Sequence, residues 1–324
     1  MRAAGGRSRA IYPSSLQAPR HARVSLLILL SGLALVAPVA IWADPQPRLF
    51  DGSGGFDGKE VFAAFAAAWP GRFSNVERLD GDWAVRLDDQ WFRWAGGRLL
   101  PVDVKNDKAW DPWPFYRYPV ALPPVRKLDP EERKALDAEL ARRDSAPDHR
   151  NPAFFDLLFH APDHDGAWER MKTILFFGHE LLVNPDILEE VAAIERRLKA
   201  EAASDRSLAD WIDSIGRVDS FTWRRIAGTA SRSMHSYGMA IDIVPAQSRG
   251  RSWYWLDARN AGLPWYDLPR SQRIPVPDKV VKTFERYGFV WGGKWFNWDL
   301  VHFEYRPDIL MLNGMSAELQ ESLR

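Results

Sequence analysis

Cysteine is absent from the 324-residue sequence. The chain can therefore form no disulfide, no thiolate metal site and no cysteine nucleophile. An excess of charge of either sign is also missing, because 43 Lys and Arg residues balance 43 Asp and Glu residues. A nucleic-acid-binding protein typically carries a basic surplus or stripe, so this balance argues against nucleic acid as a partner.

Acidic residues are missing from the first 43 positions, where five arginines precede a long apolar run. This run, residues 24–43, is about as long as a segment that crosses a bilayer. A basic flank before such a segment is typical of a signal peptide or an N-terminal membrane anchor. We therefore predict that residues 1–43 are a signal peptide or anchor. The rest of the chain is expected outside the cytoplasm, in the periplasm or cell envelope, either secreted or anchored by residues 24–43.

What is present includes 46% hydrophobic residues, which is ordinary for a globular protein and excludes wholesale disorder. Alternating residues over 83–94 predict a β-hairpin. Five prolines within residues 112–124 require an extended segment. We predict an N-terminal β-rich or linker region at residues 44–124 and a second domain at residues 125–324.

Helices and short strands are expected to mix in the second domain. Capping residues and proline predict helices that begin near Asp129 and Asn184, and a third helix spans about residues 278–287. The strand-like runs are residues 220–225, 239–244 and 301–305. Because no regular βαβ order is present, we predict the α+β class, with a small antiparallel sheet and flanking helices.

Residues 231–244 bring metal-binding side chains to a predicted strand. Asp242 lies among apolar neighbours, which is costly unless the carboxylate is paired or bound to a metal. Gly238 permits a turn before the strand, so His235 can fold back beside Asp242. An imidazole nitrogen and a carboxylate oxygen at one point suit Zn²⁺.

A second segment, residues 291–305, supplies a third candidate ligand. His302 can complete the set and leave a fourth position for water, as is typical of a catalytic zinc. Asp299 lies three residues earlier, where it can reach that water without binding the metal. This placement suits a general base. Zinc lowers the pKa of bound water to about 7, and a carboxylate can pass the proton to a leaving amine.

These two segments resemble the zinc D-alanyl-D-alanine carboxypeptidases and the related L-alanyl-D-glutamate endopeptidases, which trim peptidoglycan stem peptides. Residues 233–242 match their S-x-H-x-x-G-x-A-x-D pattern, and residues 299–302 match the later D/E-x-x-H. The resemblance implies a zinc peptidase domain at residues 125–324, with peptidoglycan stem peptides as its partner. The implied ligands of a single catalytic zinc are His235, Asp242 and His302, with Asp299 as the general base.

An upstream arginine that holds the developing oxyanion or the substrate carboxylate is a further feature of the family. Residues 221–229 resemble the F-x-W-R-x-I-A-G-T run of one branch. The resemblance assigns the role to Arg224, with Arg225 as the second candidate, and places Ser233 of the motif with Arg224 at the substrate. A guanidinium beside zinc would stabilise a tetrahedral intermediate.

Structural roles remain open for each of these residues. The three ligands could form a buried polar cluster without metal, Asp299 could be a turn or cap residue, and Arg224 could be a surface ion-pair residue. Glu304 could orient His302 or replace Asp299 as the base. The residues expected to be surface or structural histidines are His160, His164 and His179.

The sequence thus indicates a zinc metallopeptidase of the cell envelope. A D-alanyl-D-alanine carboxypeptidase is preferred, with an L-alanyl-D-glutamate endopeptidase as the alternative. A non-catalytic, zinc-containing peptidoglycan-binding module is a further alternative, although Asp299 favours the enzyme. The weakest alternative is a structural envelope protein with a Trp-rich surface, and no obligate protein partner is expected.

Overall fold

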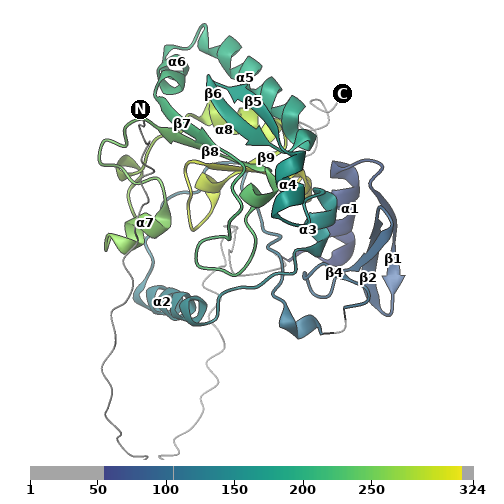
Figure 1. The fold of residues 1–324 in the computed structure, drawn as a ribbon. Coiled ribbons are helices and arrows are strands. Elements are labelled where there is room, and N and C mark those ends of the chain that lie inside the picture. Colours follow the sequence, from purple (N-terminus) through teal and green to yellow (C-terminus); the bar gives the residue numbers. More distant parts are fainter. Residues whose placement is uncertain (1–54, 105, 316–324) are drawn as a thin grey trace, which may run out of the picture. The chain divides into compact units, whose positions relative to one another are not determined.

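The computed structural model describes residues 55–104 and 106–315. The predicted signal peptide or anchor at residues 1–43 lies outside the described residues. Within residues 55–104 and 106–315, no helix is both long enough and apolar enough to cross a membrane. Small antiparallel sheets with flanking helices make up this part of the chain (Figure 1), which confirms the predicted α+β class.

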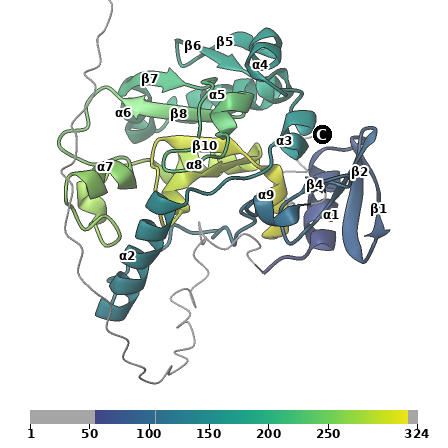
Figure 2. The same ribbon diagram turned by 60° about the horizontal axis from the view of Figure 1, so that its bottom comes forward.

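The described chain begins with a helix and a four-stranded antiparallel sheet. The elements are α1 (Gly58–Ala68), β1 (Phe73–Leu79), β2 (Asp82–Leu87), β3 (Gln90–Arg93) and β4 (Leu100–Pro101), and the strands pair in chain order. Strands β2 and β3 form the hairpin predicted for residues 83–94. Helix α1 packs against α9 (Pro307–Leu312), beside the sheet (Figure 2).

A second four-stranded sheet occupies the C-terminal half. Its strands are β7 (Ile215–Asp219), β8 (Ala240–Pro245), β10 (His302–Tyr305) and β9 (Phe289–Trp291), in that spatial order and with antiparallel pairing throughout. Helix α8 (Asp278–Arg286) contacts both β9 and α5 (Leu188–Ala202). Phe284 of α8 stacks on Phe303 of β10, with ring centroids 4.0 Å apart. Residues adjacent to Phe303 in β10 therefore point away from α8.

The remaining elements surround this sheet. Strands β5 (Lys172–Phe176) and β6 (His179–Val183) form a separate hairpin. The other α-helices are α2 (Pro130–Ser145), α3 (Ala153–Leu158), α4 (His164–Arg170), α6 (Arg206–Asp213) and α7 (Trp255–Asn260). Short 3₁₀ turns are η1 (Asp107–Ala109), η2 (Pro185–Ile187), η3 (Met234–Tyr237), η4 (Arg270–Gln272) and η5 (Gly292–Lys294).

Capping residues mark both predicted helix starts, Asp129 directly and Asn184 through a 3₁₀ turn that precedes its helix. The side chain of Asp129 accepts the backbone N–H of Glu132 at the start of α2, and Pro130 occupies the first turn. The side chain of Asn184 caps the turn η2, and the helix proper, α5, begins only at Leu188.

The predicted strand at residues 220–225 is wrong. The strand β7 ends at Asp219, and the following backbone makes one bond to β6, from the N–H of Phe221 to the carbonyl of Leu182 at 3.0 Å, and then bonds to the loop that holds His235. The N–H of Thr222 donates to the carbonyl of His235 at 3.1 Å, and the N–H of Arg224 donates to Ser236 Oγ at 2.9 Å. Because these bonds satisfy the backbone locally, the segment has no need of a strand partner.

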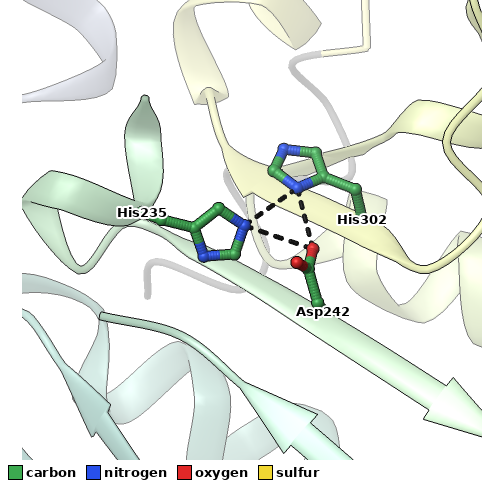
Figure 3. Close-up of side chains that lie close together, drawn as sticks. All are labelled: His235, Asp242 and His302. Carbon is green, nitrogen blue, oxygen red and sulfur yellow. Dashed lines mark hydrogen bonds and ion pairs between the residues drawn. The ribbon is translucent and has the colours of Figure 1, made fainter. Parts of the chain in front are cut away.

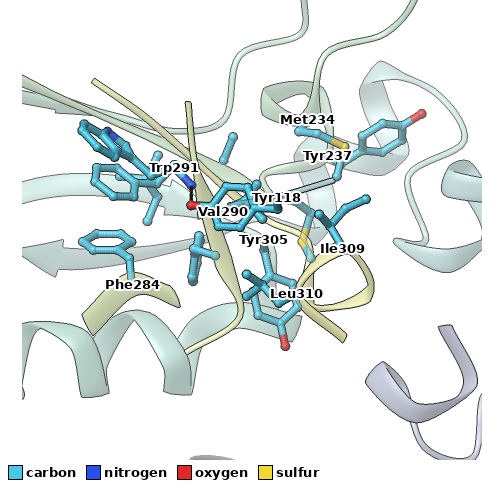
Figure 4. Packing of buried hydrophobic residues seen from close by; sticks show 14 of the residues in the cluster. Tyr118, Met234, Tyr237, Phe284, Val290, Trp291, Tyr305, Ile309 and Leu310 are labelled. Carbon is cyan, nitrogen blue, oxygen red and sulfur yellow. Dashed lines mark hydrogen bonds between the residues drawn. The ribbon is translucent and has the colours of Figure 1, made fainter. Parts of the chain in front are cut away.

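A charged network lies inside the hydrophobic core, part of which is shown in Figure 4. Glu285 Oε1 lies 2.5 Å from Lys294 Nζ and accepts the hydroxyl of Tyr118 at 2.5 Å. The hydroxyl of Tyr118 also accepts the N–H of Trp291 at 2.9 Å. Buried charges need such partners, so this network fixes the chain around Tyr118 against the loop that follows β9. The domain boundary at residue 124 stays a prediction.

A left-handed glycine allows the turn between η3 and β8. Gly238 has φ +65°, and a Cβ at this position would lie 2.7 Å from the backbone nitrogen of Asn184 and would overlap the sulfur of Met171. Only glycine relieves both the backbone strain and the steric overlap. The turn thus brings η3 back beside the start of β8.

We expect Gly238→Ala to lower the free energy of unfolding by about 3 kcal/mol, because strain and overlap add. Gly262→Ala is the control, since Gly262 has φ +72° but no atom within 4 Å of the added Cβ. That change should cost only about 1 kcal/mol. Denaturant unfolding of both variants measures the difference, and equal losses would contradict the steric role of Gly238.

Candidate metal centre

Three side chains from three elements meet at one point (Figure 3). Nε2 of His235 lies 3.2 Å from Nδ1 of His302 and 3.2 Å from Oδ1 of Asp242. Nδ1 of His302 lies 2.9 Å from the same carboxylate oxygen. Ligands about 2.0–2.1 Å from a tetrahedral zinc lie about 3.3 Å from one another, so the three atoms fit a single zinc ion. In the described ranges, no other group of His, Asp and Glu side chains is arranged this way.

Strand pairing sets two of the three ligands. His302 of β10 lies directly opposite Asp242 of β8 in the antiparallel register, so both side chains project from one face of the sheet. His235 arrives from η3, whose turn ends at Gly238. Ser233 is buried and its hydroxyl caps this turn, accepting the N–H of His235 at 3.4 Å. Ser233 thus has a local role, and its contact with substrate stays a prediction.

Hydrogen bonds leave one nitrogen of each histidine available for a metal. Nδ1 of His235 lies 2.6 Å from the carbonyl oxygen of Ser220, which can only accept, so this nitrogen carries the proton and Nε2 is the free ligand. Nε2 of His302 lies 3.2 Å from Glu304 Oε2, so Nδ1, which faces Asp242 and His235, is the nitrogen available to a metal there. Glu304 therefore orients His302, which is one of the two roles the sequence left open.

The charges of these side chains favour a cation bound between them. Burial alone would raise the pKa of Asp242, but hydrogen bonds and charges from both histidines hold that pKa well below its usual range. Burial would lower the pKa of His302, yet Asp242 and Glu304 raise it to about 10. A metal ion at this point would displace the proton that these two carboxylates stabilise on His302.

Asp299 is buried close to these ligands and is not fully paired. Its Oδ1 has no hydrogen-bond partner within the part of the chain that the structure describes. Burial and the charge of Asp242 raise the pKa of Asp299 to about 7, against the opposing charge of His302. A buried carboxylate oxygen without a partner is rare where the role is only structural, so the observation favours a functional role over a turn or cap.

Arg224 is the better placed of the two candidate arginines. Its Nη2 lies 3.9 Å from Oδ2 of Asp242, while its side chain remains 43% exposed. Arg224 and Arg225 both line a cavity of about 460 Å³, together with Trp223 and Ser236. An exposed guanidinium that touches a candidate metal ligand can reach both the metal centre and a bound substrate.

Tyr254 is a residue at the site that sequence reasoning missed. It pairs with Asp299 in an isolated antiparallel bridge, flanked by bonds from Trp255 N–H to Trp298 O at 3.0 Å and from Leu300 N–H to Trp253 O at 2.8 Å. Side chains opposite one another in such a pair lie on the same face, so the phenol lies beside the carboxylate of Asp299.

Charge effects agree with this placement of the Tyr254 phenol. Burial and the charge of Asp299 raise the pKa of Tyr254 to about 12, and Arg224 opposes the shift. No local sequence signal marks the residue, since the aromatic segment 251–266 was equally consistent with core packing and with a cleft wall.

The three histidines outside the motif that were expected to be surface or structural residues do not join the metal centre. His164 pairs with Asp165 at the start of α4 and stacks on Trp168 at 6.5 Å between ring centroids. Neither His160 nor His179 joins a cluster of three metal-ligating side chains among the described residues.

Comparison with known proteins agrees with this geometry. Residues 227–305 match the family described as D-alanyl-D-alanine carboxypeptidase. This stretch carries all three candidate ligands and Asp299, and the match supports a metallopeptidase. Residues 61–115 match a second family, described as a domain of unknown function. No curated protein and no solved structure matches the chain.

We expect Glu304→Gln to weaken zinc binding about 10- to 100-fold without abolishing it, because the amide orients His302 less strongly than the carboxylate does. Competition with a chromophoric chelator measures the affinity. Glu169→Gln, an exposed change on α4, is the matched control and should bind zinc as the unaltered chain does. Equal affinities in both variants would contradict the orienting role of Glu304.

Proposed function

We propose that the chain is a zinc-dependent D-alanyl-D-alanine carboxypeptidase that hydrolyses peptidoglycan stem peptides in the cell envelope. The observation that carries the proposal is the convergence of His235, Asp242 and His302 on one point, in a stretch that matches a peptidase family. When bound there, zinc supplies a Lewis acid that polarises a carbonyl and lowers the pKa of water.

The residues around the three ligands would transfer the proton, stabilise negative charge and bind the substrate. Asp299 is the proton acceptor, because its raised pKa lets one carboxylate take a proton and return it to the leaving amine near neutral pH. Arg224 holds negative charge that develops on the scissile carbonyl or on the substrate carboxylate. The phenol of Tyr254, beside Asp299, is placed to donate a hydrogen bond to the same substrate.

The charge of the neighbouring cavity supports a substrate with a free carboxylate. Its lining includes four arginines and no acidic residue among those described. Arg150 and Arg232 are paired with carboxylates outside the cavity, so Arg224 and Arg225 carry the charge that a ligand would meet. A carboxypeptidase must bind the terminal carboxylate beside the scissile bond, and guanidinium groups recognise carboxylates well. An L-alanyl-D-glutamate endopeptidase would meet a carboxylate in the same place, because D-Glu continues through its side chain and keeps a free α-carboxylate beside the bond that is cut. The feature therefore supports peptidase chemistry at this site without separating the two substrates.

The decisive experiment incubates the purified, zinc-loaded chain with muropeptides that end in D-Ala-D-Ala and identifies the products by mass. Loss of one terminal alanine, abolished by a chelator and restored by zinc, is the expected result. Cleavage near the lactyl end would show that the chain is an L-alanyl-D-glutamate endopeptidase and not a carboxypeptidase. No cleavage at full zinc occupancy would favour the non-catalytic peptidoglycan-binding module.

We expect Asp299→Asn to reduce kcat about 10²- to 10⁴-fold, because the amide cannot accept the proton. Zinc content and thermal stability should remain those of the unaltered chain, since Asp299 is not one of the three ligands. Asp257→Asn, an exposed change in α7, controls for loss of a carboxylate in the same region. Full activity in Asp299→Asn would remove this residue from the mechanism.

Tyr254→Phe should lower kcat/KM about 10-fold or more, because a hydrogen bond to a charged group contributes about 1.5–3 kcal/mol. The zinc affinity should not change, since the phenol is not a ligand. Tyr287→Phe, which follows α8, is the control for loss of a hydroxyl. Steady-state kinetics on the same muropeptide checks the prediction, and an unchanged kcat/KM would leave Tyr254 only a packing role.

A further inference from the structure

A second cavity, of about 260 Å³, lies behind the segment that carries Asp299. Trp298 and Leu300 line it, whereas Asp299 between them pairs with Tyr254 at the metal centre. Neighbouring side chains of an extended segment point to opposite faces. The cavity and the metal centre therefore lie on the two faces of one segment, with Trp295 between them, because it lines the cavity and its ring lies 5.5 Å from that of His302 between centroids. Neither the sequence motifs nor the proposed peptidase chemistry accounts for the cavity.

Positive charge dominates the lining of this cavity. It includes four cationic side chains, and none of the described residues that line it is acidic. Two of the cations are paired outside the cavity: Arg126 with Glu132 at 2.7 Å and Lys294 with Glu285 at 2.5 Å. The other two are Arg270 and Arg273.

Arg270 and Arg273 bond only to carbonyl oxygens in the described part of the chain. Arg270 donates to the carbonyl of Pro123, and Nε of Arg273 donates to that of Leu268 at 3.0 Å. The guanidinium of Arg273 also lies 4.5 Å from the ring centre of Trp298. Carbonyl oxygens satisfy N–H groups but do not neutralise charge, so neither the exposed Arg270 nor the partly buried Arg273 has a counter-ion among the residues that the structure describes.

The two charges are close enough to oppose one another. Burial and, to a smaller extent, the charge of Arg270 together lower the pKa of Arg273 to about 10. A guanidinium is not expected to lose its proton near neutral pH, so the repulsion persists in the unliganded protein. An anion between the two groups would offset both the burial and the repulsion.

The rest of the lining is apolar and largely aromatic. Trp291, Trp295 and Trp298 contribute indole rings, and Pro123 and Ile274 complete this apolar surface. A ligand must therefore combine one anionic group with a flat apolar body. At about 30 Å³ for each water molecule, the volume equals about nine waters, which suits a ligand of two fused rings.

We propose that this cavity binds a small amphipathic anion, with its charged group between Arg270 and Arg273 and its apolar body against Trp298. Neither arginine touches a candidate metal ligand, so the charged end of the ligand would lie apart from the metal centre. The proposal gives a function to the aromatic surface that lies between the turn η4 and the proline-rich residues 122–124.

A matched pair of probes tests the charge requirement. Naphthalene-2-carboxylate and its neutral analogue naphthalene-2-methanol differ in charge but have the same ring system. Isothermal titration of the full chain with each probe should give at least 10-fold tighter binding of the carboxylate. Equal affinities, or no binding of the carboxylate, would overturn the proposal.

Substitutions locate the bound probe. Arg273→Gln should weaken binding of the carboxylate at least 10-fold and leave the alcohol within about twofold. Arg206→Gln removes a charge from an arginine side chain on α6 that is 87% exposed, and should change neither affinity. If circular dichroism shows that Arg273→Gln does not fold, Arg270→Gln replaces it with the same expected loss. Unchanged carboxylate binding in the folded variant would overturn the proposal.

Chelation separates this cavity from the metal centre, where a carboxylate could also bind. Carboxylate binding that persists after the zinc is removed supports the proposal. Binding that disappears on chelation and survives Arg273→Gln would place the probe at the metal and overturn it. Because the readout is affinity rather than hydrolysis, failure here leaves the proposed peptidase activity untouched.

Discussion

The metal centre depends on one register, in which His302 of β10 stands opposite Asp242 of β8. A slip of one residue would turn every side chain of β10 to the other face and remove both His302 and Glu304 from the site. Packing on the opposite face of the sheet stabilises this register, because Phe303 is buried and stacks on Phe284 of α8. Core packing on one face of the sheet thus determines the chemistry available on the other.

A second constraint acts through the buried network of Tyr118, Glu285 and Lys294. It ties the loop after β9 to a segment that precedes α2 by sequence. That loop leads to Asp299, whose buried Oδ1 has no hydrogen-bond partner among the described residues. Support of the loop by this network, to which Tyr118 contributes from outside the family-matched stretch, therefore helps to hold the carboxylate in place.

The sequence predicted those features that short segments specify. Asp129 with Pro130 marks a helix start, and the spacing of His235, Gly238 and Asp242 encodes its own turn and strand. It failed where partners are distant. Residues 220–225 have a strand-like composition, but their backbone bonds to the His235 loop; Tyr254 reaches the site only through pairing with Asp299, 45 positions later. Such pairings follow from tertiary packing, which local propensity does not register.

Residues 246–277 form a long connection between β8 and α8, whose length and sequence are less constrained than those of the paired strands. Closing a longer loop costs only slightly more entropy, so this connection can change in length and sequence while the ligand strands stay paired. Yet it contributes Tyr254, Arg270 and Arg273 to two separate sites. Changes in this one connection can therefore alter what the protein binds, while the paired strands keep Asp242 and His302 in place.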